Sequence, residues 1–151
     1  MRKFVTVSVA LACGVAAATV GYTIDDRADA RPAAAAGPGR VRVELDVDYS
    51  AYSRTRLRVY AGTLVEFVVH NGDPINHELV VGPAEVHARH RRGTESVHPP
   101  IPGEVSVDPG QTRLTIYRFD EPGLIEFACH LRGHYEYGMR GTIEVVSLPP
   151  T

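Results

Sequence analysis

The sequence of 151 residues predicts an all-β domain built as a β-sandwich, and two observations support this fold class. Several short segments alternate apolar and polar side chains, which is the pattern of strands that bury one face. Turn sequences rich in Gly, Pro, Asn and Asp separate these segments at close spacing. Because no long segment has a helical period, we expect two packed sheets around one hydrophobic core.

The clearest strands lie early in this domain. In residues 41–47 every second residue is Val or Leu, and the residues between them are charged. Residues 63–71 place Val65, Phe67 and Val69 on one face. Residues 83–103 interrupt the strand rhythm, and one short helix is expected there at residues 84–91. The other strands are expected at residues 56–60, 77–81, 104–107, 112–119, 124–129 and 141–146.

The first 40 residues are expected to precede the folded domain. A basic start is followed by residues 4–24, which carry no charge. This pattern is typical of a secretory signal, and it is also long enough to span a bilayer as an anchor. Residues 25–40 are rich in Ala, Pro and Gly, which predicts a flexible linker. The expected division is therefore 1–24 signal peptide or membrane anchor, 25–40 linker and 41–151 folded domain.

Three fates of the leader are open from the sequence. It is cleaved at the small-residue site ending in Ala30, it stays as an uncleaved anchor, or it carries a lipid on Cys13. Each of them places the domain outside the cytoplasm, in the periplasm, on the cell surface or secreted, with possible membrane anchoring through residues 4–24. The net charge of −2 gives no indication of nucleic-acid binding.

The two cysteines are informative because Cys13 lies in the leader. The domain therefore contains one thiol, Cys129, and has no internal disulfide. A lone thiol in an oxidising compartment is exposed to oxidation unless it binds a metal or is buried. Both interpretations of Cys129 are open at this point.

A group of metal-ligand residues occurs at a regular spacing near the end of the chain. Cys129, His134 and Met139 form the pattern C-x4-H-x4-M, and His77 lies at the start of an earlier expected strand. A Gly directly precedes both His134 and Met139 and permits tight bends. Outside the leader, the only Cys and the only Met of the chain lie in this window. Two imidazoles, one thiolate and a weak thioether are the ligands of a type 1 copper site.

These segments resemble the cupredoxin family of blue copper proteins. The similarity is carried by residues 58–73, by Asn76-His77-Glu78-Leu79 and by residues 123–145, and it extends over residues 41–146. The loop C-H-x-x-G-H-Y-E-x-G-M is similar to that of bacterial single-domain members. The resemblance implies a Greek-key β-sandwich with one copper ion near one end. It also implies that the copper ligands are His77, Cys129, His134 and Met139.

One position departs from the family pattern. Many cupredoxins have Asn after the first His ligand, where it helps to join the two ligand segments, and this chain has Glu78. The backbone N–H groups of Glu78 and Leu131 are expected to donate to the sulfur of Cys129 and to tune the site. A Glu78 carboxylate that points inward would favour Cu(II).

The remaining histidines support weaker hypotheses. His87, His90 and His98 lie in one segment and form a possible second, weak copper site if their imidazoles are exposed, and the alternative is a solvated loop. His130 is expected to be a surface or packing residue, and His70 a structural one.

The predicted function is a one-electron carrier with one type 1 copper. The alternative is copper sequestration or delivery in copper homeostasis or resistance, since the same ligands serve both. An enzyme is not expected, because a single domain lacks the partner domain and the extra His ligands of copper nitrite reductases and oxidases. The expected partner is a redox protein or a copper donor or acceptor.

Overall fold

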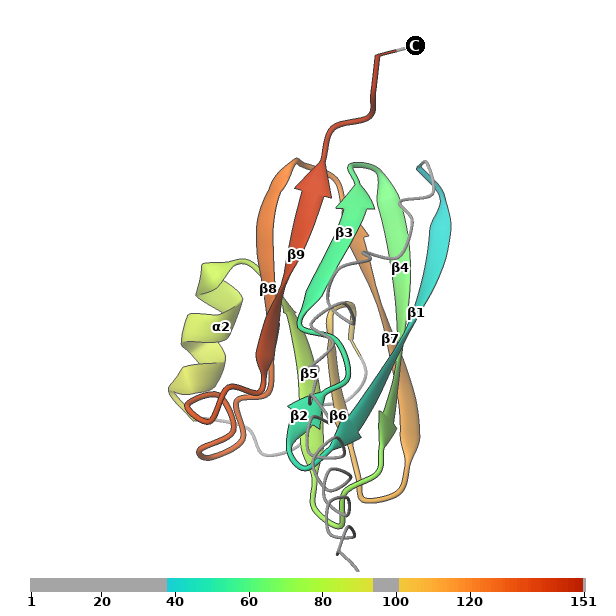
Figure 1. Ribbon diagram of the computed structural model, residues 1–151. Helices are drawn as coiled ribbons and strands as arrows, with labels where there is room; N and C mark the ends of the chain where they lie inside the picture. Colours follow the sequence, from blue (N-terminus) through green and yellow to red (C-terminus); the bar gives the residue numbers. More distant parts are fainter. Residues whose placement is uncertain (1–37, 94–100, 151) are drawn as a thin grey trace, which may run out of the picture.

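The computed structural model describes residues 38–93 and 101–150, and in these residues two β-sheets pack face to face (Figure 1). The first sheet has the order β2-β1-β4-β7 and contains β1 (Arg40–Asp48), β2 (Ala51–Tyr52), β4 (Thr63–Asn71) and β7 (Thr112–Phe119). The second has the order β3-β9-β8-β5-β6 and contains β3 (Arg56–Tyr60), β5 (His77–Gly82), β6 (Glu104–Val107), β8 (Gly123–Ala128) and β9 (Arg140–Val146). The predicted all-β sandwich is confirmed.

The chain changes sheets repeatedly, and this connectivity places distant segments side by side. β1 pairs with β4 in parallel, and β3 pairs with β9 in parallel. β5 and β8 pair antiparallel, with Val80 opposite Ala128. This arrangement agrees with the Greek-key sandwich implied by the family resemblance, and it brings the start of β5 near the end of β8.

The core lies between the two sheets and follows the predicted alternation. Val65, Phe67 and Val69 of β4 have no exposed surface. Phe67 contacts Phe119 of β7 edge to face, with ring centroids 6.4 Å apart. Burial of such side chains supplies most of the driving force for folding, so β4 anchors the first sheet.

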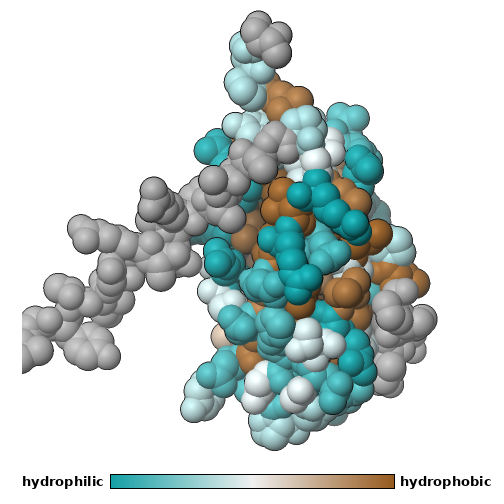
Figure 2. All heavy atoms as spheres, turned by 90° about the vertical axis from the view of Figure 1, so that its right-hand side faces the viewer, coloured by the Kyte–Doolittle hydropathy of each residue, from teal (hydrophilic) through white to brown (hydrophobic). Residues whose placement is uncertain are grey.

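The outer face of the first sheet is mainly hydrophilic, with hydrophobic side chains in separate patches (Figure 2). Arg42 pairs with Glu66 at 3.0 Å, and the His70 ring lies 2.6 Å from the Glu44 carboxylate. Exposed pairs of this kind contribute about 0.2–1 kcal/mol each. His70 is therefore a surface residue that joins neighbouring strands of the first sheet through Glu44 and Thr112, as the structural role expected of it requires.

Two local features differ from the prediction. Strand β2 was not expected, because two residues carry no periodic pattern. It follows a tight turn in which Tyr49 and Ser50 have φ angles of 51° and 56°. Two left-handed residues in succession are typical of the two-residue hairpin turn that suits the twist of antiparallel strands. β8 also ends at Ala128, so Cys129 is the first residue of the loop that follows.

Helix α2 (Ala84–Arg91) has the predicted bounds and packs beside β5 and β8 (Figure 1). His87 and His90 were expected to be exposed, and this expectation is wrong: their exposed fractions are 0% and 8%. Both lie on the side of α2 that contacts the second sheet. Val86 is the only large aliphatic residue of the helix, so no apolar stripe indicates which side is buried.

Several predictions concern other parts of the chain. The signal or anchor at residues 1–24, nearly all of the linker at residues 25–40, and His98 lie outside the described residues. Strand β1 begins at Arg40, the last residue of the predicted linker. The helical segment that the structure describes is not long and apolar enough to cross a membrane.

Candidate metal centre

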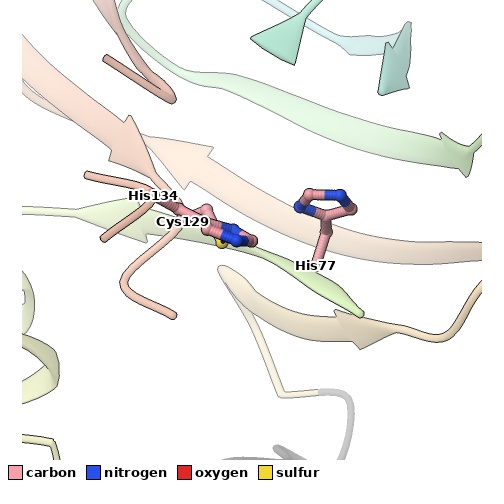
Figure 3. A group of neighbouring side chains, drawn as sticks. All are labelled: His77, Cys129 and His134. Carbon is pink, nitrogen blue, oxygen red and sulfur yellow. Dashed lines mark hydrogen bonds between the residues drawn. The ribbon is translucent and has the colours of Figure 1, made fainter. Parts of the chain in front are cut away.

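Three of the predicted ligand side chains meet at one end of the second sheet (Figure 3). His77 is the first residue of β5, Cys129 directly follows β8, and His134 lies on the loop before β9. Their ligand atoms all lie within 4.8 Å of one another. Among the described residues, no other group of three His, Cys, Asp or Glu side chains meets this criterion.

The loop between Cys129 and Met139 is closed by backbone hydrogen bonds. The amide of Cys129 donates to the carbonyl of Met139 at 3.0 Å, and the amide of Met139 donates to the carbonyl of His134 at 2.9 Å. Gly133 and Gly138 have φ angles of 89° and 98°, which other residues rarely adopt. The Met139 side chain is buried in the same hydrophobic cluster as Cys129. Its role as axial ligand stays a prediction.

The Cys129 thiol is fully buried, and burial raises its pKa to about 12. The backbone amides of Leu131 and Glu78 donate to the sulfur and partly oppose this rise, whereas the charge of Glu78 adds to it. The sulfur lies 3.2 Å from Nδ1 of His134. A metal ion would displace the thiol proton, because metals bind the thiolate.

The His77 ring is fully buried, and its two nitrogens differ. Nε2 contacts Oδ2 of Asp73 at 2.8 Å, while Nδ1 is buried with no hydrogen-bond partner. A buried polar atom without a partner costs about 1–3 kcal/mol, so such an atom in a folded protein requires an explanation. The ring centroids of His77 and His134 lie 4.8 Å apart. Burial and the neighbouring His77 lower the pKa of His134, which keeps its ring neutral and able to bind a metal.

These residues fit a copper ion. A thiolate and two imidazoles are donors of a type 1 site, and Nδ1 of His77 is a buried ring nitrogen to which no hydrogen-bonding group is directed. Burial of the Cys129 and His77 side chains would restrict the access of water to a bound ion.

Glu78 joins the two ligand segments. Its side chain is only 1% exposed, and Oε1 accepts a hydrogen bond from the backbone amide of His130 at 2.7 Å. Its backbone carbonyl accepts the hydroxyl of Tyr52. The carboxylate therefore points inward and connects β5 to the residue that follows Cys129.

Helix α2 contacts the ligand loop through a hydrogen bond between His87 of the helix and His130 of the loop. Nδ1 of His87 lies 2.8 Å from Nε2 of His130, and Nε2 of His87 lies 3.1 Å from the carbonyl oxygens of Gly82 and Glu126. Carbonyl oxygens only accept, so Nε2 of His87 carries the proton and Nδ1 accepts from His130. His130 also stacks on Tyr135, with ring centroids 5.0 Å apart. It is a packing residue, as expected.

The predicted second copper site gains no support from this arrangement. Both nitrogens of His87 already have partners, and Nδ1 of His90 lies 2.8 Å from the carbonyl oxygen of Val86. His98, the third proposed ligand, lies outside the described residues.

Asp73 is the site residue that sequence reasoning missed. It lies in the segment Asn71-Gly72-Asp73-Pro74, whose residue types predict a turn and indicate no further role. Burial alone would raise the pKa of Asp73, but hydrogen bonds from the Ser50 and Tyr49 amides and from His77 lower it below its ordinary value. An acidic residue four positions before a His ligand was the available signal.

No protein family model matches the chain. Among curated proteins, the copper-resistant cuproprotein CopI of Rubrivivax gelatinosus is 35% identical over 119 residues, which covers 76% of this chain and 72% of that protein. CopI of Vibrio cholerae is 32% identical over 108 residues, covering 70% of this chain and 64% of that protein. CopI of Pseudomonas aeruginosa is 27% identical over 147 residues, and the aligned part covers 76% of this chain and 81% of that protein.

Solved structures show the same fold. A reduced auracyanin from Roseiflexus castenholzii has a TM-score of 0.60 and 21% identity, covering 74% of this chain and 99% of that one. Auracyanin A of Chloroflexus aurantiacus, described as a "blue" copper protein, has a TM-score of 0.55 and 19% identity, covering 71% and 99%. A blue copper oxidase from Nitrosomonas europaea has a TM-score of 0.54 and 17% identity, covering 75% and 40%.

Proposed function

Because the chain belongs to the CopI family of copper-resistant cuproproteins, we propose that it is a copper-resistance protein that binds one copper ion outside the cytoplasm. The observation that carries this proposal is the convergence of His77, Cys129 and His134, with one nitrogen of His77 buried and unpartnered. The basic start and the uncharged residues 4–24 support export of the chain.

In the proposed site, four residues bind the copper ion. His77, Cys129 and His134 would hold the ion, and the thioether of Met139 would be a weak fourth ligand. Bound copper would supply one-electron chemistry between Cu(I) and Cu(II). The chain contributes the hydrogen bonds that hold the sulfur and the burial that restricts water.

A one-electron carrier is the second candidate, and the hydrogen-bonded ligand loop favours it. Backbone hydrogen bonds close this loop, and the donor atoms of His77, Cys129 and His134 lie close together. Ligands that move little between the two copper oxidation states lower the barrier to electron transfer, and sequestration of copper does not require this property. The partner would then be a redox protein instead of a copper donor or acceptor. Neither candidate requires a catalytic role.

The first test is titration of Cu(II) into the metal-free full-length protein with the thiol reduced. We expect an intense visible thiolate-to-copper absorption that saturates at one copper per chain. Cys129→Ser should abolish it, because a hydroxyl cannot replace the thiolate. Cys13→Ser, the same substitution in the leader, is the matched control and should keep the colour. A colourless wild-type protein with copper added and Cys129 reduced would contradict the proposed site.

The second test separates resistance from electron transport. In a bacterium that lacks its own CopI, the wild-type chain should raise the copper concentration that permits growth, and the Cys129→Ser chain should not. Unchanged copper tolerance from a chain that is exported and carries its full visible absorption would count against resistance and favour the carrier.

A further inference from the structure

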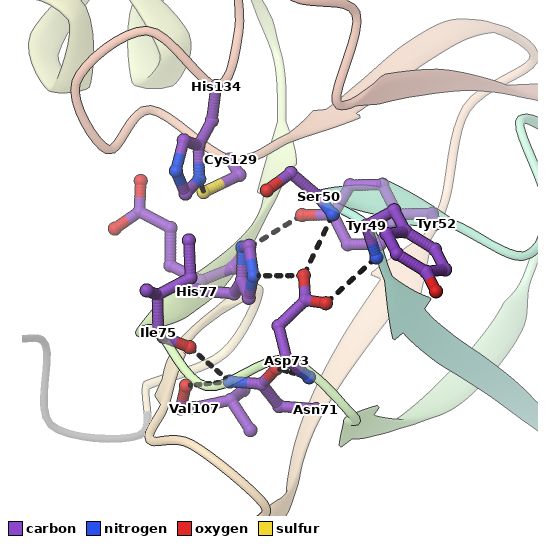
Figure 4. Close-up of polar contacts among 11 residues, drawn as sticks. Tyr49, Ser50, Tyr52, Asn71, Asp73, Ile75, His77, Val107, Cys129 and His134 are labelled. Carbon is purple, nitrogen blue, oxygen red and sulfur yellow. Dashed lines mark hydrogen bonds and ion pairs between the residues drawn. The ribbon is translucent and has the colours of Figure 1, made fainter.

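Asp73 forms a buried contact with one of the proposed ligands and belongs to no ligand set itself (Figure 4). It lies on the loop between β4 and β5, and it is only 7% exposed. Its Oδ2 atom lies 2.8 Å from Nε2 of His77, on the side of the ring away from the unpartnered Nδ1. The carboxylate is therefore close enough to the site to act through His77.

The β1–β2 turn holds this carboxylate in place. The amide of Tyr49 donates to Oδ1 at 2.8 Å, and the amide of Ser50 donates to Oδ2 at 2.8 Å. Both turn residues are left-handed, with φ angles of 51° and 56°, and their successive amides reach one carboxylate. The amide of Asp73 itself donates to the Asn71 side chain at 3.0 Å. The orientation of the Asp73 residue is thus fixed by the turn amides at its carboxylate and by Asn71 at its backbone.

These contacts also fix the proton of the His77 ring. Asp73 accepts hydrogen bonds from two amides, and a carboxylate in this position also accepts from the ring. Nε2 of His77 then carries the proton, and Nδ1 keeps its lone pair for a metal. A carboxylate behind a metal-binding imidazole orients the ring and makes it a stronger donor.

We propose that Asp73 is the positioning residue of His77, and that its negative charge makes the site favour Cu(II) over Cu(I). This inference rests on the proposed copper site and deepens it. A low-dielectric environment strengthens the attraction between the carboxylate and the more highly charged ion. The β1–β2 turn, far from the ligand loop in the sequence, thereby contributes to the redox balance of the site.

The test compares Asp73→Asn with Asp120→Asn in the full-length protein. Asp120 is exposed on the β7–β8 turn, at the opposite end of the sandwich (Figure 1), and its substitution removes the same charge. We expect Asp73→Asn to bind copper with the visible absorption retained, and its preference for Cu(II) to fall at least tenfold. This corresponds to a rise of about 59 mV in reduction potential by voltammetry. Asp120→Asn should change the preference less than twofold.

A second measurement needs no variant. Nitrogen-15 NMR of the metal-free wild-type protein reports which ring nitrogen of His77 is protonated, and we expect a slowly exchanging proton on Nε2. A proton on Nδ1 would overturn the positioning role. A coloured Asp73→Asn protein with the potential of Asp120→Asn would overturn the electrostatic role. A wild-type protein that forms no type 1 copper site would overturn both the proposed function and the redox effect. The NMR measurement would still show whether Nε2 of His77 donates its proton to Asp73.

Discussion

Met139 and Cys129 would contribute the two sulfur atoms of the proposed copper site, and the two residues are expected to act differently. Cys129 is the donor on which the visible absorption depends, whereas an axial thioether binds weakly. We therefore predict that Met139→Gln keeps copper and lowers the reduction potential, because an amide oxygen favours Cu(II) more than a thioether does. A tenfold change in this preference is about 59 mV, and we expect a decrease of this order by voltammetry.

Met139→Leu gives a matched control of similar volume that removes the donor atom without adding an oxygen. It should retain the visible absorption, and its potential should lie above that of Met139→Gln. An unchanged or raised potential in Met139→Gln would show that Met139 is not the axial ligand.

Two carboxylates lie close to the proposed ligands, and they act on different segments. Glu78 holds the residue after Cys129, and Asp73 holds the ring of His77. Both charges would favour Cu(II) over Cu(I). Glu78 connects the ligand segments as the Asn of many cupredoxins does, but with a charge that an Asn lacks.

At the level of elements, α2 is the helix that packs beside β5 and β8 near the site. Its His87 is buried and bonds to His130, which directly follows Cys129 in the chain. Burial lowers the pKa of His87, and burial with the neighbouring His87 and His90 lowers the pKa of His130 to about 4. The contact between α2 and the ligand loop therefore depends on neutral imidazoles.

This dependence predicts that acid destabilises the metal-free protein. The unfolded chain takes up protons near the ordinary His pKa of 6.5, whereas the folded chain takes them up only at lower pH. The stabilisation is complete above pH 6.5 and is lost as the pH falls toward 4. Urea unfolding at pH 7.5 and pH 5 measures the loss, which should be smaller in His87→Gln.

His70→Gln provides the control for this measurement, because His70 lies on the outer face of the first sheet and contacts neither α2 nor the loop. It should lose as much stability on acidification as the wild type. Equal losses in His87→Gln and the wild type would show that the α2 contact does not titrate in this range.

At the level of the whole molecule, the sandwich is the frame that brings the ligand segments together. The pairing of β5 with β8 places His77 and Cys129 at one end, and β9 continues from the ligand loop into the second sheet. Because the ligands extend from strands anchored in one core, we expect the site to be formed before copper binds.

The whole chain is also predicted to be exported. In a bacterial host, fractionation should recover it from the periplasm or the membrane, since residues 4–24 have the pattern of a secretory signal. A charge in this apolar run, as in Leu11→Arg, should retain the chain in the cytoplasm, whereas Leu11→Val should be exported normally. Recovery of the wild-type chain from the cytoplasm would contradict the prediction.

Local pattern was sufficient for most of the fold and for the donor set. The alternation of side chains, together with the Gly and Pro turns between segments, located eight of the nine strands in the described residues. The donors were apparent because the domain has one Cys and one Met, both in the C-x4-H-x4-M loop. Strand β2 was not predicted, because a strand of two residues is too short to show a periodic pattern.

Tertiary packing alone decided what surrounds the donors. The bond between His87 and His130 joins residues 43 positions apart, and the Tyr49 amide reaches Asp73 across 24 positions. Periodicity reports which side of an element is apolar, but it carries no information on which polar group from another element will meet it. The burial of His87 and the contact between the Tyr49 amide and Asp73 therefore became visible only when the strands were placed side by side.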